Sequence, residues 1–487
     1  MTLLPEVVLV LTGVILLLFD AFAPKATVGF LGKLSLAGVL VALASTFTLD
    51  PGAGPLWEGL YAVDSLALFF KQFFLITLFW VLAMNFKPAE VMRYGATESF
   101  VLPIFCAVGM LVLASAVDFM TLFVGLELVT ISFYVMVALR RGHKASLEAG
   151  VKYLIIGALS TGFLVYGIAF LYGSTGTTDL SALILRISAY PTPDLALLFA
   201  VTLLLTGIGF KLASVPFHVW APDVYQGAPS PVTAFLSVGS KAAGFVVLLR
   251  VFYFSGFSHA AVVGYVAGAI ALMAALSVIL GNFAALPQRN LKRLLAYSGI
   301  GHAGFMLMGL SCTRPGPVFD ERGVQAVLVY LVVYMLSALL AFFIISRYED
   351  ELGGSDIKAF SGLARRAPLA AWGMLLSFVS MAGIPPLAGF LGKLGIFAAL
   401  WRTQHYGLLA VGLISAVAGL YYYLKVVGAM YWTQPLTSAD VVPVRGWSAV
   451  AIALLSILIL MLGFWPMPIQ WWIEPVLSQG SLIFSLR

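Results

Sequence analysis

Cysteine and charged residues are both scarce in this sequence. Only two of the 487 residues are cysteines, Cys106 and Cys312, and 10% of the residues are charged. Two cysteines are too few for an iron–sulfur cluster or a four-cysteine zinc site. A phosphate loop of the GxxxxGK[ST] type is also missing, so ATP is not expected to be the energy source. We therefore expect no redox centre of these types and no metal site in this chain.

One glycine-rich motif matches a nucleotide-binding pattern only formally. The letters "GIGHAG", Gly299 to Gly304, fit GxGxxG but lie inside an apolar helical stretch. No strand precedes them, and no acidic residue follows at the distance that a dinucleotide site requires. The motif therefore indicates helix packing, and no nucleotide or nucleic-acid partner is expected.

Apolar residues dominate what is present. Hydrophobic residues make up 61% of the chain, and the mean hydropathy is +1.03. Runs such as "VVLVLTGVILLLF" do not alternate as the strands of a membrane β-barrel do. The first run begins with Glu6 rather than with basic residues, so we expect a retained helix and not a signal peptide. The sequence predicts an all-α polytopic membrane protein in a lipid bilayer.

The apolar runs predict about fourteen membrane spans. The expected spans are 4–22, 29–49, 63–86, 99–116, 119–139, 150–172, 195–217, 230–254, 260–284, 291–311, 324–346, 368–400, 406–431 and 447–468. Loops such as those around Arg140 and Lys292 carry most of the basic residues, which favours both termini outside a bacterial cytoplasmic (inner) membrane. Loops are short, so a single membrane domain is expected.

The basic residues within these expected spans are all lysines. They are Lys71, Lys152, Lys211, Lys241, Lys393 and Lys425, whereas every arginine falls in a loop or at the end of a span. A buried lysine can lose its proton near neutral pH, and arginine effectively cannot. This distribution of lysine and arginine therefore favours the interpretation that the lysines within the spans are sites that change charge.

Glu127 and Lys241 lie deepest in the expected spans. Glu127 is nine residues from Asp118 and thirteen from Arg140, roughly 13 to 20 Å along a helix. A charge at this depth costs about 2.5 to 3.5 kcal/mol on insertion scales, so it needs a partner, water or neutralisation. One interpretation is an ion pair with a lysine that only joins helices; the other is a protonatable station on an ion path.

Two lysines accompany prolines in the middle of a span. Pro216 follows Lys211, and "GIPPLAGFLG" precedes Lys393. Both spans should be broken helices, a feature of ion sites in transporters, although an ordinary proline kink is the alternative. The two spans are five apart, as in inverted five-helix repeats at 99–254 and 260–431, flanked by helices in 1–98 and 432–487. In one span the lysine precedes the proline, and in the other it follows.

Five other ionisable residues are secondary candidates. His218 and His302 could relay protons or could be ordinary packing residues. Lys152 could pair with Glu148 one turn earlier. For Lys71 and Lys425 a structural role is favoured.

Four blocks of the sequence resemble the antiporter-like membrane subunits of respiratory complex I, the NADH-quinone oxidoreductase. They are "VKYLIIGALSTGFLVYGIAFLYGSTGT", "GFKLASVPFHVWAPDVYQGAPSPVTAFLS", "NLKRLLAYSGIGHAGF" and "MAGIPPLAGFLGKLGIF". Two features make the sequence more similar to the subunit N branch than to the L and M branches. One is Lys393 within "PPLAGFLGK", and the other is that the chain ends soon after the last expected span. Cyanobacterial and plastid homologues of that branch share these blocks.

This resemblance implies a fourteen-helix fold with two half-channels and a role in proton pumping. It implies that Glu127 and Lys211 form an ion pair, that Lys241 passes protons along the centre and that Lys393 is the terminal lysine; His302 and Lys152 match axis and entry positions. It further implies that FMN, the iron–sulfur clusters and the NADH site lie on other subunits. The implied partners are subunit M, small membrane subunits and the quinone pool.

Two rival functions stay open. A multi-subunit cation/proton antiporter shares the half-channels, and its neighbouring genes would encode antiporter subunits instead of complex I subunits. A membrane-arm subunit that conducts nothing would tolerate charge-neutral variants at Glu127, Lys211, Lys241 and Lys393.

Overall fold

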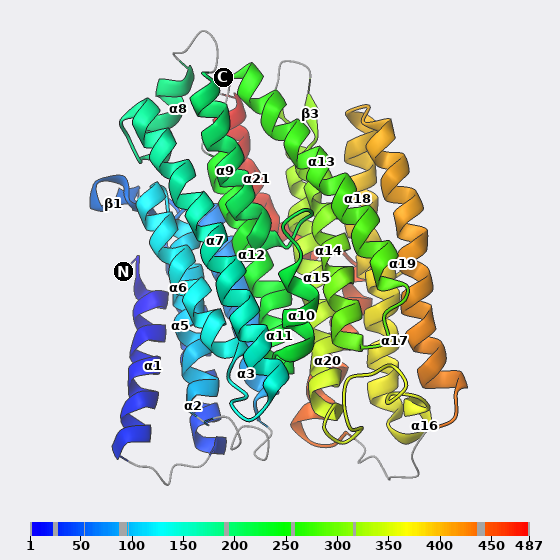
Figure 1. Cartoon of the computed structure of the whole chain (residues 1–487). Helices are drawn as coiled ribbons and strands as arrows, with labels where there is room; N and C mark the ends of the chain where they lie inside the picture. The colour runs from blue at the N-terminus through cyan, green and yellow to red at the C-terminus, as the bar shows by residue number, and fades with distance from the viewer. Residues whose placement is uncertain are drawn as a thin grey trace. The chain divides into compact units, whose positions relative to one another are not determined.

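Helices form most of the chain that the structure describes (Figure 1). The structure is a computed structural model, and it describes residues 2–22, 28–52, 54–86, 95, 97–188, 194–254, 259–314, 318–435 and 444–485. Its elements are α1 Leu4–Phe22, α2 Val28–Thr46, β1 Pro55–Leu56, η1 Trp57–Gly59, β2 Tyr61–Ala62, α3 Ser65–Met84, α5 Glu98–Ser115, α6 Phe119–Val137, α7 Lys144–Thr175, α8 Leu180–Ser188, α9 Leu195–Leu212, α10 Trp220–Gly227, α11 Ser230–Phe235, η2 Leu236–Ser240, α12 Lys241–Leu248, η3 Leu249–Phe254, α13 Ala260–Ala285, α14 Leu291–Leu310, β3 Thr313–Arg314, β4 Val318–Phe319, α15 Glu321–Tyr348, α16 Leu363–Arg366, α17 Pro368–Ala382, α18 Ala388–Arg402, α19 Tyr406–Trp432, α20 Trp447–Phe464 and α21 Met467–Ser485.

The helices have the length and composition of membrane spans. Within the described ranges, 12 helical segments are long and apolar enough to cross a bilayer, so the chain is a multi-pass membrane protein. Two of the expected spans are not among them. α14 has 20 residues but includes Lys292 and His302, and the stretch expected at 368–400 forms two helices of 15 residues each. The exact number of fourteen spans stays a prediction.

The chain divides into two compact units. The first comprises Met1–Leu212, Gly227–Tyr265 and Pro475–Arg487, and the second Ala213–Gln226 and Val266–Glu474. This division does not test the expected single domain with repeats at 99–254 and 260–431, which stays a prediction.

Small residues allow close helix packing in the first unit. α5 and α6 touch where Gly109 meets Gly125, because a Cβ atom on Gly109 would lie 2.9 Å from the carbonyl oxygen of Gly125. Without a hydrophobic driving force between helices in lipid, such close van der Waals contact is a main source of association. In the most apolar stretch of the segment 230–254 all residues are buried, whereas in that of α1 only 33% of the residues are buried. The segment 230–254 therefore provides a dry setting for Lys241.

The second unit packs around α15. This helix is 94% buried over its most apolar window and contacts α14, α17, α18 and α20. The strands β3 and β4 form a short antiparallel hairpin just before it, with Thr313 opposite Phe319. Lys393 on α18 and His302 on α14 thus lie on helices that pack against one central helix.

Two interruptions divide helices that the apolar pattern predicts as single spans. α9 ends at Leu212 and is followed by Ala213, with φ 53°, whereas α17 ends at Ala382 and is followed by Gly383, with φ 84°. Three residues further along, Pro216 and Pro386 each follow a cis peptide bond. Proline has no N–H for the helix ladder and disfavours helix in the preceding residue. The expected breaks in the seventh and twelfth spans are confirmed.

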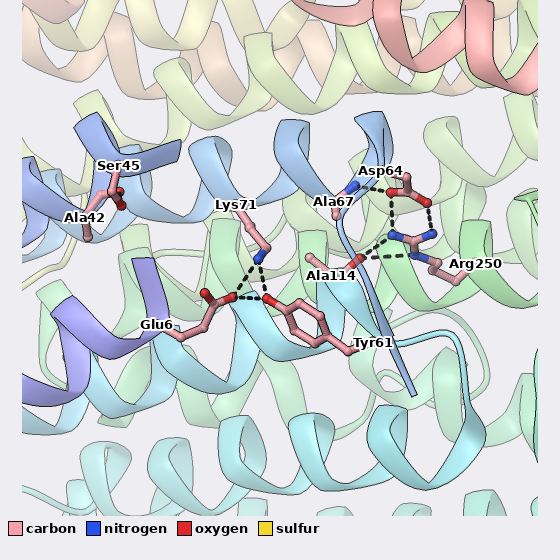
Figure 2. Close-up of polar contacts among 9 residues, drawn as sticks. All are labelled: Glu6, Ala42, Ser45, Tyr61, Asp64, Ala67, Lys71, Ala114 and Arg250. Carbon is pink, nitrogen blue, oxygen red and sulfur yellow. Dashed lines mark hydrogen bonds and ion pairs between the residues drawn. The ribbon is translucent and has the colours of Figure 1, made fainter. Parts of the chain in front are cut away.

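Buried ion pairs connect separate helices of the first unit (Figure 2). Lys71 Nζ on α3 donates to Glu6 Oε1 on α1 at 2.7 Å, and the Tyr61 hydroxyl donates to the same oxygen at 2.7 Å. Beside them, the Arg250 guanidinium of η3 binds both carboxylate oxygens of Asp64. Arg250 lies nine residues after Lys241 in one continuous helical segment. Its ion pair therefore attaches the helix that carries Lys241 to the start of α3.

Lys71→Met is expected to destabilise the chain by about 3 to 5 kcal/mol, because it leaves the Glu6 carboxylate buried without a counter-ion. The double variant Glu6→Gln/Lys71→Met should lose much less, since no charge is then stranded. Unfolding of the purified chain in detergent, followed by tryptophan fluorescence, measures both. Lys33→Met changes an exposed lysine on α2 and serves as the control. Equal losses in the single and double variants would contradict the assignment of the ion pair.

Candidate functional site

Lys211 joins α9 to α6 inside the first unit. It lies in the last turn of α9 and is only 4% exposed. Its ammonium group donates a hydrogen bond to the Thr130 hydroxyl on α6, which in turn donates to the Leu126 carbonyl at 2.6 Å. Burial removes the water that would otherwise solvate the ammonium, so this hydroxyl is the hydrogen-bond acceptor available to it.

Glu127 lies one helical turn before Thr130 on α6. Its Oε1 accepts a hydrogen bond from the Thr161 hydroxyl on α7 at 2.7 Å, and the residue is half-buried. Glu127 and Lys211 do not form a direct ion pair here, although they are close enough for their charges to interact. The ion pair implied by the family resemblance stays a prediction. The structure instead places the two charges against threonines on facing helices.

Lys241 begins α12 directly after the π-helical segment η2 and is 2% exposed. Gly244, one turn later, faces α9. A Cβ atom there would lie 2.7 Å from Leu212 Cδ2 and 3.4 Å from Lys211 Cβ. Positions three residues apart on a helix share a face, so Lys241 lies on the face of α12 that packs against the end of α9. The two lysines are therefore on contacting helices, and π-helical turns are frequent at functional sites.

Lys393 in the second unit binds the end of a helix. The N–H of Gly383 donates to the Ser380 carbonyl at 2.9 Å and that of Ile384 to the Val379 carbonyl at 3.2 Å, a Schellman motif that ends α17. The Ala382 carbonyl accepts Lys393 Nζ at 2.7 Å. A Cβ atom on Gly383 would lie 2.7 Å from Lys393 Cδ. Glycine at 383 therefore permits both the positive φ and the approach of the lysine.

Lys211 and Lys393 are both associated with the C-terminal end of the half-helix that precedes a break. Lys211 precedes its break and lies in the last turn of the first half-helix. Lys393 follows its break but reaches back to the carbonyl of Ala382, the last residue of the first half-helix. The C-terminal end of a helix carries partial negative charge from its unpaired carbonyls, and it stabilises a cation. The Lys393 ammonium is thus held by a helix-end carbonyl without a full counter-charge, whereas the Lys211 ammonium is held by the Thr130 hydroxyl.

His302 stands between two tyrosines in the second unit. Its Nδ1 is 2.8 Å from the Tyr330 hydroxyl and its Nε2 is 2.9 Å from the Tyr423 hydroxyl. The Tyr423 hydroxyl also hydrogen-bonds to the Ser298 hydroxyl. A neutral imidazole donates from one nitrogen and accepts at the other. The four side chains form a continuous hydrogen-bonded row across α14, α15 and α19.

Lys393 lies beside residues of α15 and α14 that belong to this row or lie close to it. A Cβ atom on Gly392, next to Lys393, would lie 2.8 Å from the Tyr330 ring. Lys393 Nζ also lies 5.2 Å from the centre of the Phe305 ring, three residues after His302 on α14. The row of His302 and Lys393 therefore belong to one packed cluster.

The remaining predicted residues lie outside these two clusters. Lys152 forms the expected i, i+4 ion pair with Glu148 at 2.8 Å, with 43% of its side chain exposed, so that prediction is confirmed. His218 is half-buried in the irregular segment between α9 and α10. Lys425 is exposed and donates to the Leu286 and Gln288 carbonyls after α13. Its expected structural role agrees with this C-terminal capping position.

The buried ion pair of Lys292, like those of Lys71 and Arg250, was not anticipated from the sequence. Lys292, which we counted among the basic residues of the loop at the start of the expected span 291–311, is the second residue of α14 and is 3% exposed. Its Nζ is 3.3 Å from Glu349 Oε2 at the end of α15. The hydrophobicity of the sequence predicts that a span begins just before Lys292. It does not show that the start of α14 packs against the end of α15.

Several hydrogen-bond partners of the site were also missed. Thr130 and Thr161 are common membrane-helix residues with no distinguishing local pattern. Tyr423 lies in the run of three tyrosines before Lys425, which is a weak signal, and Tyr330 has none. Only the one-turn spacing of Glu127 and Thr130 could have indicated that these two share a helix face.

Metal binding has no candidate group in the described residues. No cluster of three or more histidine, cysteine, aspartate or glutamate side chains there could hold a metal ion. The chemistry of the two clusters is that of groups that take up and release protons: lysine, glutamate, histidine and hydroxyl side chains.

Comparison with known proteins relates this arrangement to a family. The family described as NADH:quinone oxidoreductase/Mrp antiporter, TM matches residues 116–419, the part that contains Glu127 and all three buried lysines of the two clusters. NADH-quinone oxidoreductase subunit N of Desulforamulus reducens is 39% identical over 466 residues, which cover 95% of each chain.

Solved structures agree with this match. A chain of respiratory complex I from Thermus thermophilus is 34% identical, with a TM-score of 0.78, covering 95% of this chain and 97% of that one. A chain of the Mrp complex from Dietzia sp. DQ12-45-1b has a TM-score of 0.83 at 20% identity, covering 99% and 98%, a likeness that shows the fold alone. The chain therefore belongs to the family of NADH:quinone oxidoreductase and Mrp antiporter membrane subunits, within which it aligns over nearly its whole length with subunit N of NADH-quinone oxidoreductase.

Proposed function

We propose that this chain is a proton-translocating membrane subunit of an NADH-quinone oxidoreductase. It couples electron transfer from NADH to quinone, carried out on other subunits, to proton movement across the membrane. The observation that carries the proposal is the placement of Lys211 and Lys393 at the C-terminal ends of interrupted helices. Such half-helix ends hold cations in transporters.

The proposed mechanism moves one proton through three lysines. A charge signal from quinone reduction elsewhere in the complex changes the separation of Glu127 and Lys211. With the carboxylate further away, the Lys211 ammonium releases its proton to the neutral amine of Lys241. Lys241 then passes a proton to the neutral amine of Lys393, and each donor is left neutral until it is reprotonated.

Separate residues support uptake and exit in this proposal. Lys152 with Glu148 lies at the entry, and His218 lies in the first break, where irregular backbone admits water. In the second unit the row Tyr330, His302, Tyr423 offers a hydrogen-bonded route. His302 can take up a proton at one nitrogen while it gives up the proton on the other.

The proposal extends to the finer architecture and to partners. The helices form fourteen spans with inverted repeats at 99–254 and 260–431, and the corresponding breaks carry a positive φ at Ala213 and at Gly383. Both termini lie outside the bacterial cytoplasmic membrane. Subunit M and small membrane subunits are neighbours, whereas FMN and the iron–sulfur clusters lie on subunits that exchange electrons with the quinone pool.

A cation/proton antiporter is the second candidate function. It is favoured by the fold shared with the Mrp complex chain, but the identity of 34% with the Thermus thermophilus complex I chain favours the oxidoreductase. Genes for complex I subunits beside the gene for this chain would support the first function, and antiporter genes would support the second.

Affinity purification of the tagged chain from its native membranes tests the proposal. It is expected to recover an assembly that contains FMN, oxidises NADH and reduces quinone. Recovery of an assembly that exchanges Na⁺ for protons without NADH oxidation would contradict it.

A further inference from the structure

A groove between α15 and α18 lies outside the residues of the proposed proton path. Its volume is about 230 Å³, and its lining includes Arg322, Val329, Leu391, Ala398, Arg402 and Gln470. All of these residues belong to the second unit. None of them takes part in the clusters of Lys393 or His302.

One end of the groove is cationic. Arg322 lies in the first turn of α15 and is exposed, and in the described part of the chain no carboxylate pairs with it, although Glu321 precedes it. Arg402, the last residue of α18, lies 3.6 Å from Asp320 Oδ1, an oxygen that also pairs with Arg314 at 2.6 Å. Asp320 therefore offsets only part of the arginine charge, and Arg322 stays free to bind an external anion.

The other end of the groove is apolar. Arg322 and Val329 are seven residues apart on α15, and Ala398 and Leu391 are seven apart on α18. Seven residues are two helical turns, so each helix presents one stripe about 10 Å long along the groove. The small side chain of Ala398 and its neighbour Gly395 leave space between these stripes.

Tryptophans mark the level of the cationic end. Trp401 precedes Arg402 and is 66% exposed, and Trp471 follows Gln470 and is 56% exposed. Exposed tryptophans at the ends of membrane helices gather at the interface between headgroups and hydrocarbon. The cationic end therefore lies at headgroup level, and the apolar stripes extend into the acyl region.

We propose that this groove binds an anionic phospholipid. The phosphate lies between Arg322 and Arg402, with the planar guanidinium groups suited to phosphate oxygens. One acyl chain lies between α15 and α18 along Val329, Leu391 and Ala398. A free phosphate would leave the apolar part empty, and a zwitterionic lipid would gain less from the arginines. The proposal depends on the membrane location of the chain and not on its role in proton transfer.

Lipid retention by the purified complex tests this site. The complex is exchanged in mild detergent with phosphatidylglycerol and phosphatidylcholine of matched chains, and the bound lipid is quantified by mass spectrometry. Arg322→Gln is expected to lower retained phosphatidylglycerol at this site about fivefold, the effect of one basic residue near an anionic surface. Arg365→Gln makes the same change at an exposed arginine outside the groove and should retain the lipid.

A second pair of variants tests the acyl part without touching a charge. Ala398→Phe fills the groove and should also lower retention, whereas Ala410→Phe, at an exposed position on α19, should not. Equal retention in Ala398→Phe and Ala410→Phe, or in Arg322→Gln and Arg365→Gln, overturns the proposal. Displacement of the lipid by millimolar inorganic phosphate, or no preference for phosphatidylglycerol in the unaltered complex, overturns it as well.

Discussion

Lys211→Ala is expected to abolish redox-driven proton pumping in the assembled complex, to below about a tenth of the unaltered level. Alanine removes the group that takes and releases the proton and leaves the Thr130 hydroxyl without its buried donor. Proteoliposomes that contain the complex, an NADH supply and a pH-sensitive dye measure protons moved per NADH oxidised. Assembly is checked on native gels, because a failure to assemble would by itself explain a loss of pumping.

Two further variants separate proton release from charge and packing. Lys425→Ala removes an exposed lysine that caps α13 and should pump normally. Lys211→Arg keeps a positive charge at the end of α9 but cannot deprotonate, so it should assemble and still fail to pump. Normal stoichiometry in Lys211→Ala would contradict the proposed path, and normal pumping in Lys211→Arg would show that only the charge matters.

Lys393→Gln is the second variant with a large expected effect. The glutamine amide can still donate to the Ala382 carbonyl, so the end of α17 stays satisfied and the complex should assemble. The amide does not take up a proton, so the last step from Lys241 is blocked. Pumping per NADH is expected to fall to below about a tenth of normal in the same proteoliposome assay.

Lys393→Leu provides the matched comparison for stability. It leaves the buried Ala382 carbonyl without a donor, which costs about 1 to 3 kcal/mol, so thermal unfolding should begin at a lower temperature than in Lys393→Gln. If Lys393→Gln pumps at the normal ratio, Lys393 is a capping residue of α17 and not a proton carrier. Normal pumping in charge-neutral variants at Glu127, Lys211, Lys241 and Lys393 together would favour the rival function of a subunit that conducts nothing.

The fold was predictable from local features. Long apolar runs require helices in lipid, and the runs match the observed helices to within a few residues at most boundaries. The prolines at 216 and 386 predicted two interruptions, because the missing N–H and the steric clash act on the residues immediately before them. The central positions of Glu127 and Lys241 in their expected spans followed from counting along the sequence.

The partners of these side chains were not predictable in the same way. Lys71 pairs with Glu6 across 65 residues, and His302 with Tyr423 across 121. A hydrogen bond of this kind depends on which helices pack together and on how each is rotated. Apolar periodicity is weak in helices that are buried on all sides, so it does not report that rotation.

The sequence by itself determined that this chain is a multi-pass helical membrane protein, with lysines inside its spans and two helices interrupted at prolines. Only the tertiary structure decided that Lys393, which follows its break, lies at the same end of a half-helix as Lys211, which precedes its own. The reason is that composition and helix breaks act over a few residues. The carbonyls that hold an ammonium, in contrast, are supplied by whichever helix end the folded chain brings beside it.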